Sequence, residues 1–69
     1  MKIKAGDRLV VAHIDDKCEN FSYLVACGFV RGATVVVHAV SALKEAALVQ
    51  VSGSVVCIKK NILKQIEWA

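Results

Sequence analysis

Short runs of apolar residues alternate with turn-forming residues along most of this chain. The runs are rich in valine, which favours extended backbone, and glycine, serine or acidic residues separate them. Two of the runs are joined only by Ser52-Gly53, which predicts a tight hairpin turn. The pattern therefore predicts a mainly β fold, a small and partly open barrel of about five strands. The strands are expected over residues 8–14, 34–40, 46–51, 54–58 and 65–68, with a short C-terminal helical turn over 59–63.

One helix is predicted between the first two strands, from the Asp15-Asp16 pair to Cys27. Either aspartate is a good N-cap, and Glu19 follows Asp16 at the spacing of a capping box. The apolar residues at positions 18, 21, 24 and 25 share one face at helical spacing. Gly28 stands where a helix takes a left-handed residue after its last turn. The helix is therefore expected to end at Gly28, with a further turn before the next strand.

The strands alternate poorly between apolar and polar positions. The runs 35–37 and 55–58 are apolar on both faces of the pleat. A strand that is buried on one face alone should alternate, so either helices cover the second face or that face binds something. A chain of 69 residues has too few helical residues to cover everything. This pattern favours an interaction module that meets a partner or forms a homo-oligomer.

The charge balance is mildly basic, with a formal net charge of +3. Lysines and an arginine lie near both ends of the chain, at positions 2, 4 and 8 and at 59, 60 and 64. The sequence leaves open whether these two groups meet in space. A nucleic-acid-binding domain of this size would more often carry a dense basic stripe with aromatic residues. Nucleic acid is therefore not the expected partner.

The three cysteines argue for a reducing compartment. Their number is odd and no pair has the C-x-x-C spacing, so a disulfide framework is not expected. The N-terminus lacks the apolar core of a signal peptide, and the uncharged stretches are shorter than the ~20 residues of a membrane helix. We expect a cytoplasmic protein without a membrane span of its own. Cys27 and Cys57 occupy apolar-periodic positions and are expected to be core thiols.

A metal site is the chemical alternative to an interaction surface. His13, Asp16, Cys18 and His38 are weak candidates for ligands of Fe²⁺ or Zn²⁺, because zinc sites usually take three or four such groups at short spacing. No catalytic residues are expected, since a chain this short does not enclose a substantial pocket. The predicted protein is therefore not an enzyme, and no bound cofactor is required by the pattern.

Five segments in one order resemble the ferrous-iron-transport protein A (FeoA) family. The strongest runs from Leu24 through Cys27-Gly28-Phe29-Val30-Arg31-Gly32, which is similar to the family's Leu-x-x-Met-Gly-Leu/Met-x-Pro-Gly. Cys27, Phe29 and Arg31 replace its methionine, leucine and proline. The resemblance extends over nearly the whole chain and predicts a single domain over residues 1–69. The other segments are Gly6-Asp7-Arg8-Leu9-Val10-Val11, Val49-Gln50-Val51-Ser52-Gly53, Ile58-Lys59-Lys60 and Ile66-Glu67-Trp68.

The resemblance implies an SH3-like barrel and a non-catalytic role in ferrous iron transport. The implied partner is a membrane ferrous-iron permease with a GTP-binding domain, met on its cytosolic side. Similar domains also occur in iron-dependent repressors, which leaves a metal-binding regulatory domain as the alternative function. The family's Pro-Leu-Gly-Asp-Pro loop is replaced here by residues 42–46, which keep only Leu43 and an acidic residue. The residues expected to contact a partner are Leu43, Arg31, Lys44 and Glu45.

Overall fold

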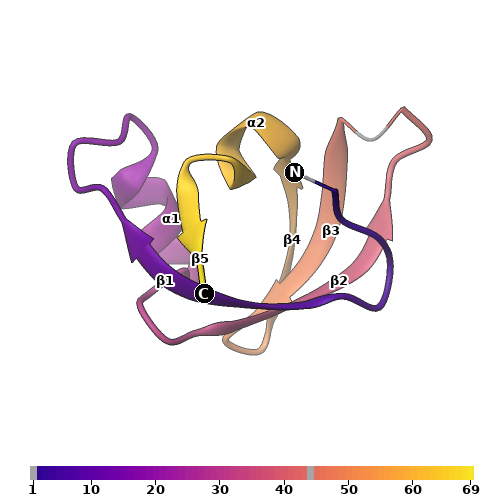
Figure 1. The fold of residues 1–69 in the computed structure, drawn as a ribbon, viewed down its shortest axis with the longest axis horizontal. Coiled ribbons are helices and arrows are strands. Elements are labelled where there is room, and N and C mark those ends of the chain that lie inside the picture. Colours follow the sequence, from indigo (N-terminus) through magenta and orange to yellow (C-terminus); the bar gives the residue numbers. More distant parts are fainter. Residues whose placement is uncertain (1, 44) are drawn as a thin grey trace.

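The computed structural model describes residues 2–43 and 45–69, in which five strands and two short helices form one small domain (Figure 1). This confirms the mainly β barrel of about five strands with one inserted helix and a short C-terminal helical turn. No helix in these residues has the length and apolar character needed to cross a membrane. The elements are β1 (Arg8–Ile14), α1 (Phe21–Cys27), β2 (Thr34–Val40), β3 (Ala46–Val51), β4 (Ser54–Lys59), α2 (Lys60–Leu63) and β5 (Ile66–Trp68).

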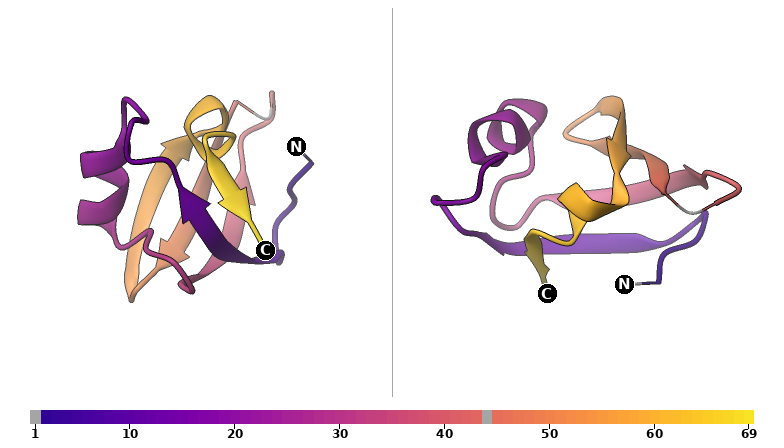
Figure 2. Two further views of the ribbon diagram at one scale, coloured as in Figure 1. Left: turned by 60° about the vertical axis from the view of Figure 1, so that its left-hand side comes forward. Right: turned by 90° about the horizontal axis from the view of Figure 1, so that it is seen from above.

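The described strands form one antiparallel sheet in the order β4-β3-β2-β1-β5. β1 changes partner along its length: Arg8–Val10 pair with β2, and Val11–Ile14 pair with β5, with a register shift after Val11. A bulge of this kind bends a strand and increases its twist, which lets the sheet curl into a barrel (Figure 2). In all three ribbon views α1 lies on the opposite side of the barrel from the β2–β3 loop.

The barrel interior is lined by alternate residues of each strand. Val35 and Val37 of β2 face Val51 and Val49 of β3, and all four are at most 1% exposed. Because the side-chain period of a strand is two, this register turns the residues between them to the outer face. The other fully buried large side chains are Leu24, Phe29, Ile58, Leu63 and Val11.

The C-terminus of α1 has the predicted left-handed cap. Gly28 has φ +102°, its N–H donates to the carbonyl of Val25, and the N–H of Phe29 donates to the carbonyl of Leu24. This pair of hydrogen bonds is the Schellman arrangement, in which apolar side chains from both ends of the motif usually meet. Leu24 and Phe29 are both fully buried, so the helix end is also part of the core.

The predicted start of this helix is wrong. α1 begins at Phe21, with Asn20 as its cap residue, instead of following Asp15-Asp16. The Asp15 carboxylate accepts the N–H of Lys17 at 2.9 Å, so it caps a local turn of its own. Aspartate commonly competes with helix formation in this way. The Asn20 side chain makes no cap hydrogen bond to α1, and its amide nitrogen donates to the side-chain oxygen of Gln65 at 3.2 Å.

Candidate functional site

The outer face of β3 and β4 carries an uncovered row of apolar side chains. Leu48 is 40% exposed, Val55 is 54% exposed, and Cys57 is also exposed. We call Leu48, Val55 and Cys57 the apolar row. Leu48 pairs with Cys57 across the two strands, so their side chains stand on the same face. The poor alternation of apolar and polar residues in β4 therefore reflects an outer face that no helix of the described chain covers.

The placement of Cys57 corrects the expectation of a core thiol. Ile58 points into the barrel and is 2% exposed, so the neighbouring Cys57 must point outward. Cys27 is half-buried at the end of α1 and packs against the core. The sequence predicted a second apolar face for residues 55–58 but did not identify Cys57 and Leu48 as part of it; the pairing of the two apolar runs around Ser52-Gly53 brings them together.

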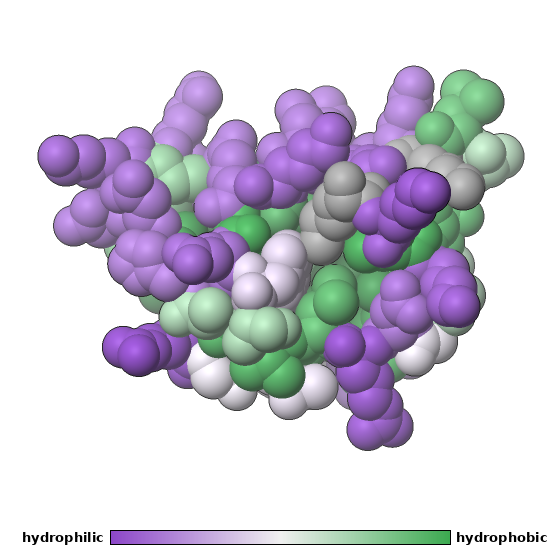
Figure 3. Space-filling model, viewed as in Figure 1, coloured by the Kyte–Doolittle hydropathy of each residue, from purple (hydrophilic) through white to green (hydrophobic). Residues whose placement is uncertain are grey.

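The β2–β3 loop is held at its base by one hydroxyl group. Ser41 Oγ accepts the N–H groups of Glu45 at 3.0 Å and Ala46 at 3.1 Å, and the Ser41 N–H donates to the Ala46 carbonyl. These bonds close the base and leave the tip projecting. Leu43 is 79% exposed, the highest value among the exposed large apolar residues of the described chain. Figure 3 shows apolar atoms projecting at this corner of the molecule, with hydrophilic groups beside them.

An apolar hollow of about 230 Å³ connects the apolar row to this loop. Leu48 and Cys57 line it from the strands, and Ser41 and Ala46 line it from the base of the loop. Leu43 is three residues from Ala46, so the chain separates their Cα atoms by at most about 11 Å. The apolar hollow thus adjoins the apolar row, and the tip of the loop lies only a short stretch of chain from the residues that line the hollow.

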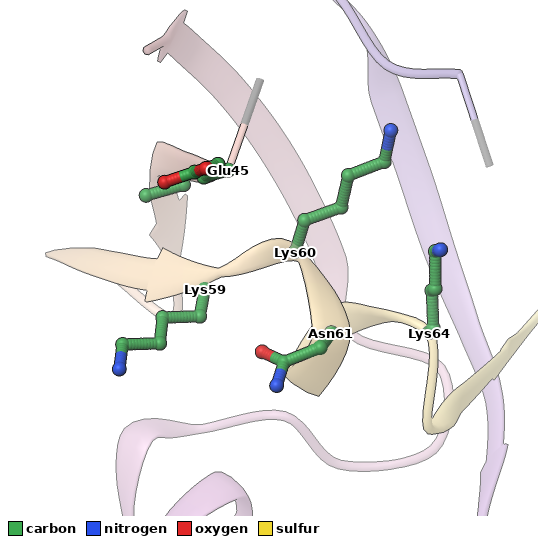
Figure 4. Close-up of a pocket in the computed structure, with 6 residues that line it drawn as sticks. Glu45, Lys59, Lys60, Asn61 and Lys64 are labelled. Carbon is green, nitrogen blue, oxygen red and sulfur yellow. The ribbon is translucent and has the colours of Figure 1, made fainter. Parts of the chain in front are cut away.

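A second hollow, of about 450 Å³, is also lined by Ala46. The N–H of Lys60, the first residue of α2, donates to the carbonyl of Glu45 at 2.8 Å and so fixes α2 against the loop. In Figure 4, the Lys60 side chain at the start of α2 and the Lys64 side chain just after α2 both point toward the top of the view, whereas Lys59 points the other way from the end of β4. We call this the lysine hollow; its lining residues are Glu45, Ala46, Lys59, Lys60, Asn61 and Lys64.

The four predicted contact residues fall into two places. Leu43 and Glu45 lie in the β2–β3 loop, and Lys44, between them, lies outside the described residues. Arg31 is exposed, as expected of a turn residue, but it precedes β2 whereas Leu43 follows it. Seven strand residues at roughly 3.3 Å each separate the two positions by about 20 Å. Arg31 instead lines a separate hollow of about 220 Å³ beside α1, together with His13 and Phe29.

The candidate metal ligands do not converge. His38 is on β2, where its ring Nε2 lies 2.8 Å from the side-chain oxygen of Gln50. The Cys18 thiol donates to the side-chain oxygen of Gln65 at 2.6 Å, and His13 lines the hollow beside α1. In residues 2–43 and 45–69, no three His, Cys, Asp or Glu side chains are grouped closely enough to hold a metal ion. Asp16, the remaining candidate, is exposed in the turn before α1.

Three solved structures are similar to this chain over almost its full length. A FeoA-like protein from Clostridium acetobutylicum gives a TM-score of 0.89 at 15% identity, covering 99% of this chain and 79% of that one. Iron(II) transport protein A from Clostridium thermocellum gives 0.86 at 19% identity, with coverage of 97% and 41%. FeoA protein from Chlorobium tepidum gives 0.83 at 27% identity, with coverage of 97% and 64%. The chain thus spans less than two thirds of the length of the last two.

A search of curated proteins by sequence finds no significant match. The family model for the FeoA domain, in contrast, matches residues 1–68. This match includes the glycine-capped helix end, the Ser52-Gly53 turn and the closing strand, all of which the structure forms at the expected positions. The chain therefore belongs to the FeoA family, and membership of that family implies a role in ferrous iron transport.

Proposed function

We propose that this protein is a non-catalytic, cytoplasmic accessory of ferrous iron transport that docks onto the cytosolic side of a membrane ferrous-iron permease with a GTP-binding domain. The observation that carries the proposal is the exposed apolar surface of the apolar row and the apolar hollow, together with the exposed Leu43 in the neighbouring loop. Leu43, Leu48 and Val55 are 79%, 40% and 54% exposed. Contiguous apolar surface of this kind typically marks a protein interaction site.

The geometry favours Leu43 as the anchor of the contact. Leu43 is at the tip of a loop whose base is held together by the Ser41 hydroxyl. Its side chain is therefore largely exposed to solvent. Complete burial of a leucine side chain contributes about 1.5–3 kcal/mol. Loss of that contribution weakens binding by roughly tenfold or more. Glu45, and Lys44 beside it, are proposed to contact the partner at the rim.

The test is direct binding of the purified protein to the intact permease from the same organism, held in lipid nanodiscs. We expect saturable binding that Leu43→Asp and Val55→Asp each weaken by at least about tenfold. Val30→Asp is the matched control, because Val30 is 47% exposed but lies at the other end of β2. It should leave the affinity unchanged.

Two results would contradict the proposal. If Leu43→Asp and Val55→Asp fold and bind like the wild type, the apolar surface is not the contact site. If the wild type does not bind the permease and light scattering shows a stable oligomer, the apolar surface serves self-association instead. An effect of Arg31→Ala on binding would show that the contact extends to the α1 side of the barrel.

A further inference from the structure

The lysine hollow is a cationic site whose charges are not used within the described chain. Lys60 is the first residue of α2 and Lys64 follows its last residue, about one turn later, and both side chains point toward the top of Figure 4. None of the side-chain hydrogen bonds among the described residues involves an ammonium group of Lys59, Lys60 or Lys64. Two like charges at this spacing on a helix destabilise it slightly. A ligand with negative charge would relieve that repulsion.

The site lies directly beside the apolar surface. Ala46 lines both the lysine hollow and the apolar hollow, and Lys59 follows Val55 and Cys57 as the next outward-facing residue of β4. The bond from the Lys60 N–H to the Glu45 carbonyl holds the two hollows in a fixed relation. A single extended segment that crosses Ala46 would therefore meet apolar side chains first and ammonium groups next.

We propose that this combined surface selects an acidic segment of a protein partner, one in which an aliphatic residue is followed by Asp or Glu residues. The aliphatic side chain occupies the apolar hollow, and the carboxylates lie against Lys60 and Lys64. The inference rests on the proposed function, since it gives the chemistry of the partner's docking segment. Glu45, on the rim, adds a repulsion that disfavours segments carrying negative charge on both sides.

Other anions fit the site less well. Single-stranded nucleic acid needs aromatic side chains on which bases stack, and none lines the lysine hollow. Compact phosphate sites usually offer free backbone N–H groups. Here the N–H of Lys60 already donates to Glu45 and that of Lys64 donates to Lys60. Solvated lysines that flank an apolar hollow suit carboxylates on a polypeptide better than an isolated phosphate.

The test compares two synthetic peptides of one length, one with a leucine followed by a run of glutamates and one with the same leucine followed by a run of glutamines. Both are titrated into the isotope-labelled protein at low salt, with backbone amide shifts as the readout. We expect the glutamate peptide to bind at least about fivefold more tightly, with shifts centred on Ala46, Lys60 and Lys64. Its affinity should fall as salt rises, because exposed charges are screened.

Charge-reversal variants locate the effect. Lys60→Glu and Lys64→Glu should each weaken the glutamate peptide by about threefold and together by about tenfold, while leaving the glutamine peptide unchanged. Lys17→Glu makes the same change in net charge on the α1 side of the barrel and is the matched control. Equal affinities for the two peptides, or equal losses in the Lys17→Glu control, would overturn the proposal. So would inorganic triphosphate displacing the glutamate peptide at lower concentration than the peptide itself requires.

Binding to the permease separates this inference from the proposed function. If Leu43→Asp abolishes permease binding and the Lys60→Glu/Lys64→Glu double variant does not change it, the docking role holds and the acidic segment is wrong. If the wild type does not bind the permease but binds the glutamate peptide more tightly, and this difference depends on Lys60 and Lys64, the preference for an acidic segment holds and the proposed partner is wrong. Loss of permease binding in both variants supports both.

Discussion

The two ends of β3 differ in almost every physical respect. At its C-terminal end, the Ser52-Gly53 turn packs against the capped end of α1, and the core residues Leu24 and Phe29 are fully buried nearby. At its N-terminal end, the β2–β3 loop projects with Leu43 exposed at its tip, and the two hollows meet at Ala46. The first region holds the fold together and the second is available for contact. Substitutions at one end should therefore change stability, and substitutions at the other should change binding.

The largest effect should come from Phe29, because it joins the helix end to the core. Phe29→Ala removes a fully buried aromatic side chain and should cost about 3–5 kcal/mol in the free energy of unfolding. A loss of that size would leave most of a domain this small unfolded. Phe29→Leu, with an expected cost of roughly 1 kcal/mol, is therefore the variant whose stability can be measured. Urea denaturation followed by Trp68 fluorescence is the assay. Val30→Ala, at the next position and 47% exposed, is the control and should change stability by no more than about 0.5 kcal/mol. A large loss of stability in Val30→Ala would mean that burial in the core does not set the stability effects at this end of β3.

The second-largest effect tests the contact between the C-terminal cap of α1 and the β3–β4 turn. A Cβ added at Gly28 would lie 2.7 Å from Ser52 Oγ, and the backbone there has φ +102°. Gly28→Ala should therefore lower the free energy of unfolding by about 2 kcal/mol, from backbone strain and the clash together.

A double-mutant cycle separates these two causes. Ser52→Gly removes the clashing side chain, so it should recover about 1 kcal/mol in the Gly28→Ala background but not the part due to positive φ. If the two changes are additive in urea denaturation, the cap and the turn do not touch in solution. Ser52 itself has φ 51°, which makes glycine compatible with its backbone.

The same division explains what could be predicted from the sequence. The helix end at Gly28-Phe29 and the turn at Ser52-Gly53 could be predicted because the backbone hydrogen bonds that form them join residues only a few positions apart. Each of these residue types also has one main structural role in such a motif. The start of α1 was misplaced because the Asp15 carboxylate could cap either a helix or its own turn, and both are local. The turn before α1 is also tied to Gln65 by Cys18 and Asn20, a contact across more than 40 residues that no local pattern contains.

The candidate site depends on contacts that no local pattern contains. The apolar row follows from the register between β3 and β4, which places Cys57 opposite Leu48 and outside the barrel. The lysine hollow requires the bond between Lys60 and Glu45, which are fifteen positions apart in the sequence. Sequence reasoning could name Leu43 as an aliphatic residue in a polar loop, but it could not place the base of that loop against α2.

A smaller effect is expected at the N-terminal end of β3, where substitutions in the loop should leave stability nearly unchanged. Leu43→Asp should change the free energy of unfolding by no more than about 0.5 kcal/mol, because the side chain is 79% exposed and packs against little. Thermal denaturation of this variant beside the wild type is the measurement. A loss above about 1 kcal/mol would mean that Leu43 folds back onto the barrel, and reduced partner binding could then no longer be assigned to a lost contact.

The smallest effect concerns Tyr23 of α1, which lines a shallow hollow together with Cys57 of the apolar row. Side-chain hydrogen bonding with Cys27 favours the protonated phenol and raises the pKa of Tyr23 above its ordinary 10.0, with further contributions from the charge of a Cys27 thiolate, burial and Cys57. Tyr23 is the only tyrosine in the chain, so the ultraviolet absorbance of tyrosinate reports its pKa alone. Cys27→Ala should move that pKa back toward 10.0, and Cys18→Ala should not.

The direction of the accompanying change in stability follows from the same shift in pKa. A phenol whose pKa is higher in the folded than in the unfolded chain contributes stability that is fully present below the unfolded value and is lost as the pH rises through the folded value. The wild type should therefore lose slightly more stability above pH 10.0 than Tyr23→Phe does, when both are unfolded with urea across that range. Tyr23 is 47% exposed, so solvent screens the interaction and the difference should be small. Identical alkaline profiles, together with an unshifted tyrosinate titration, would show that Tyr23 and Cys27 do not interact in the folded protein.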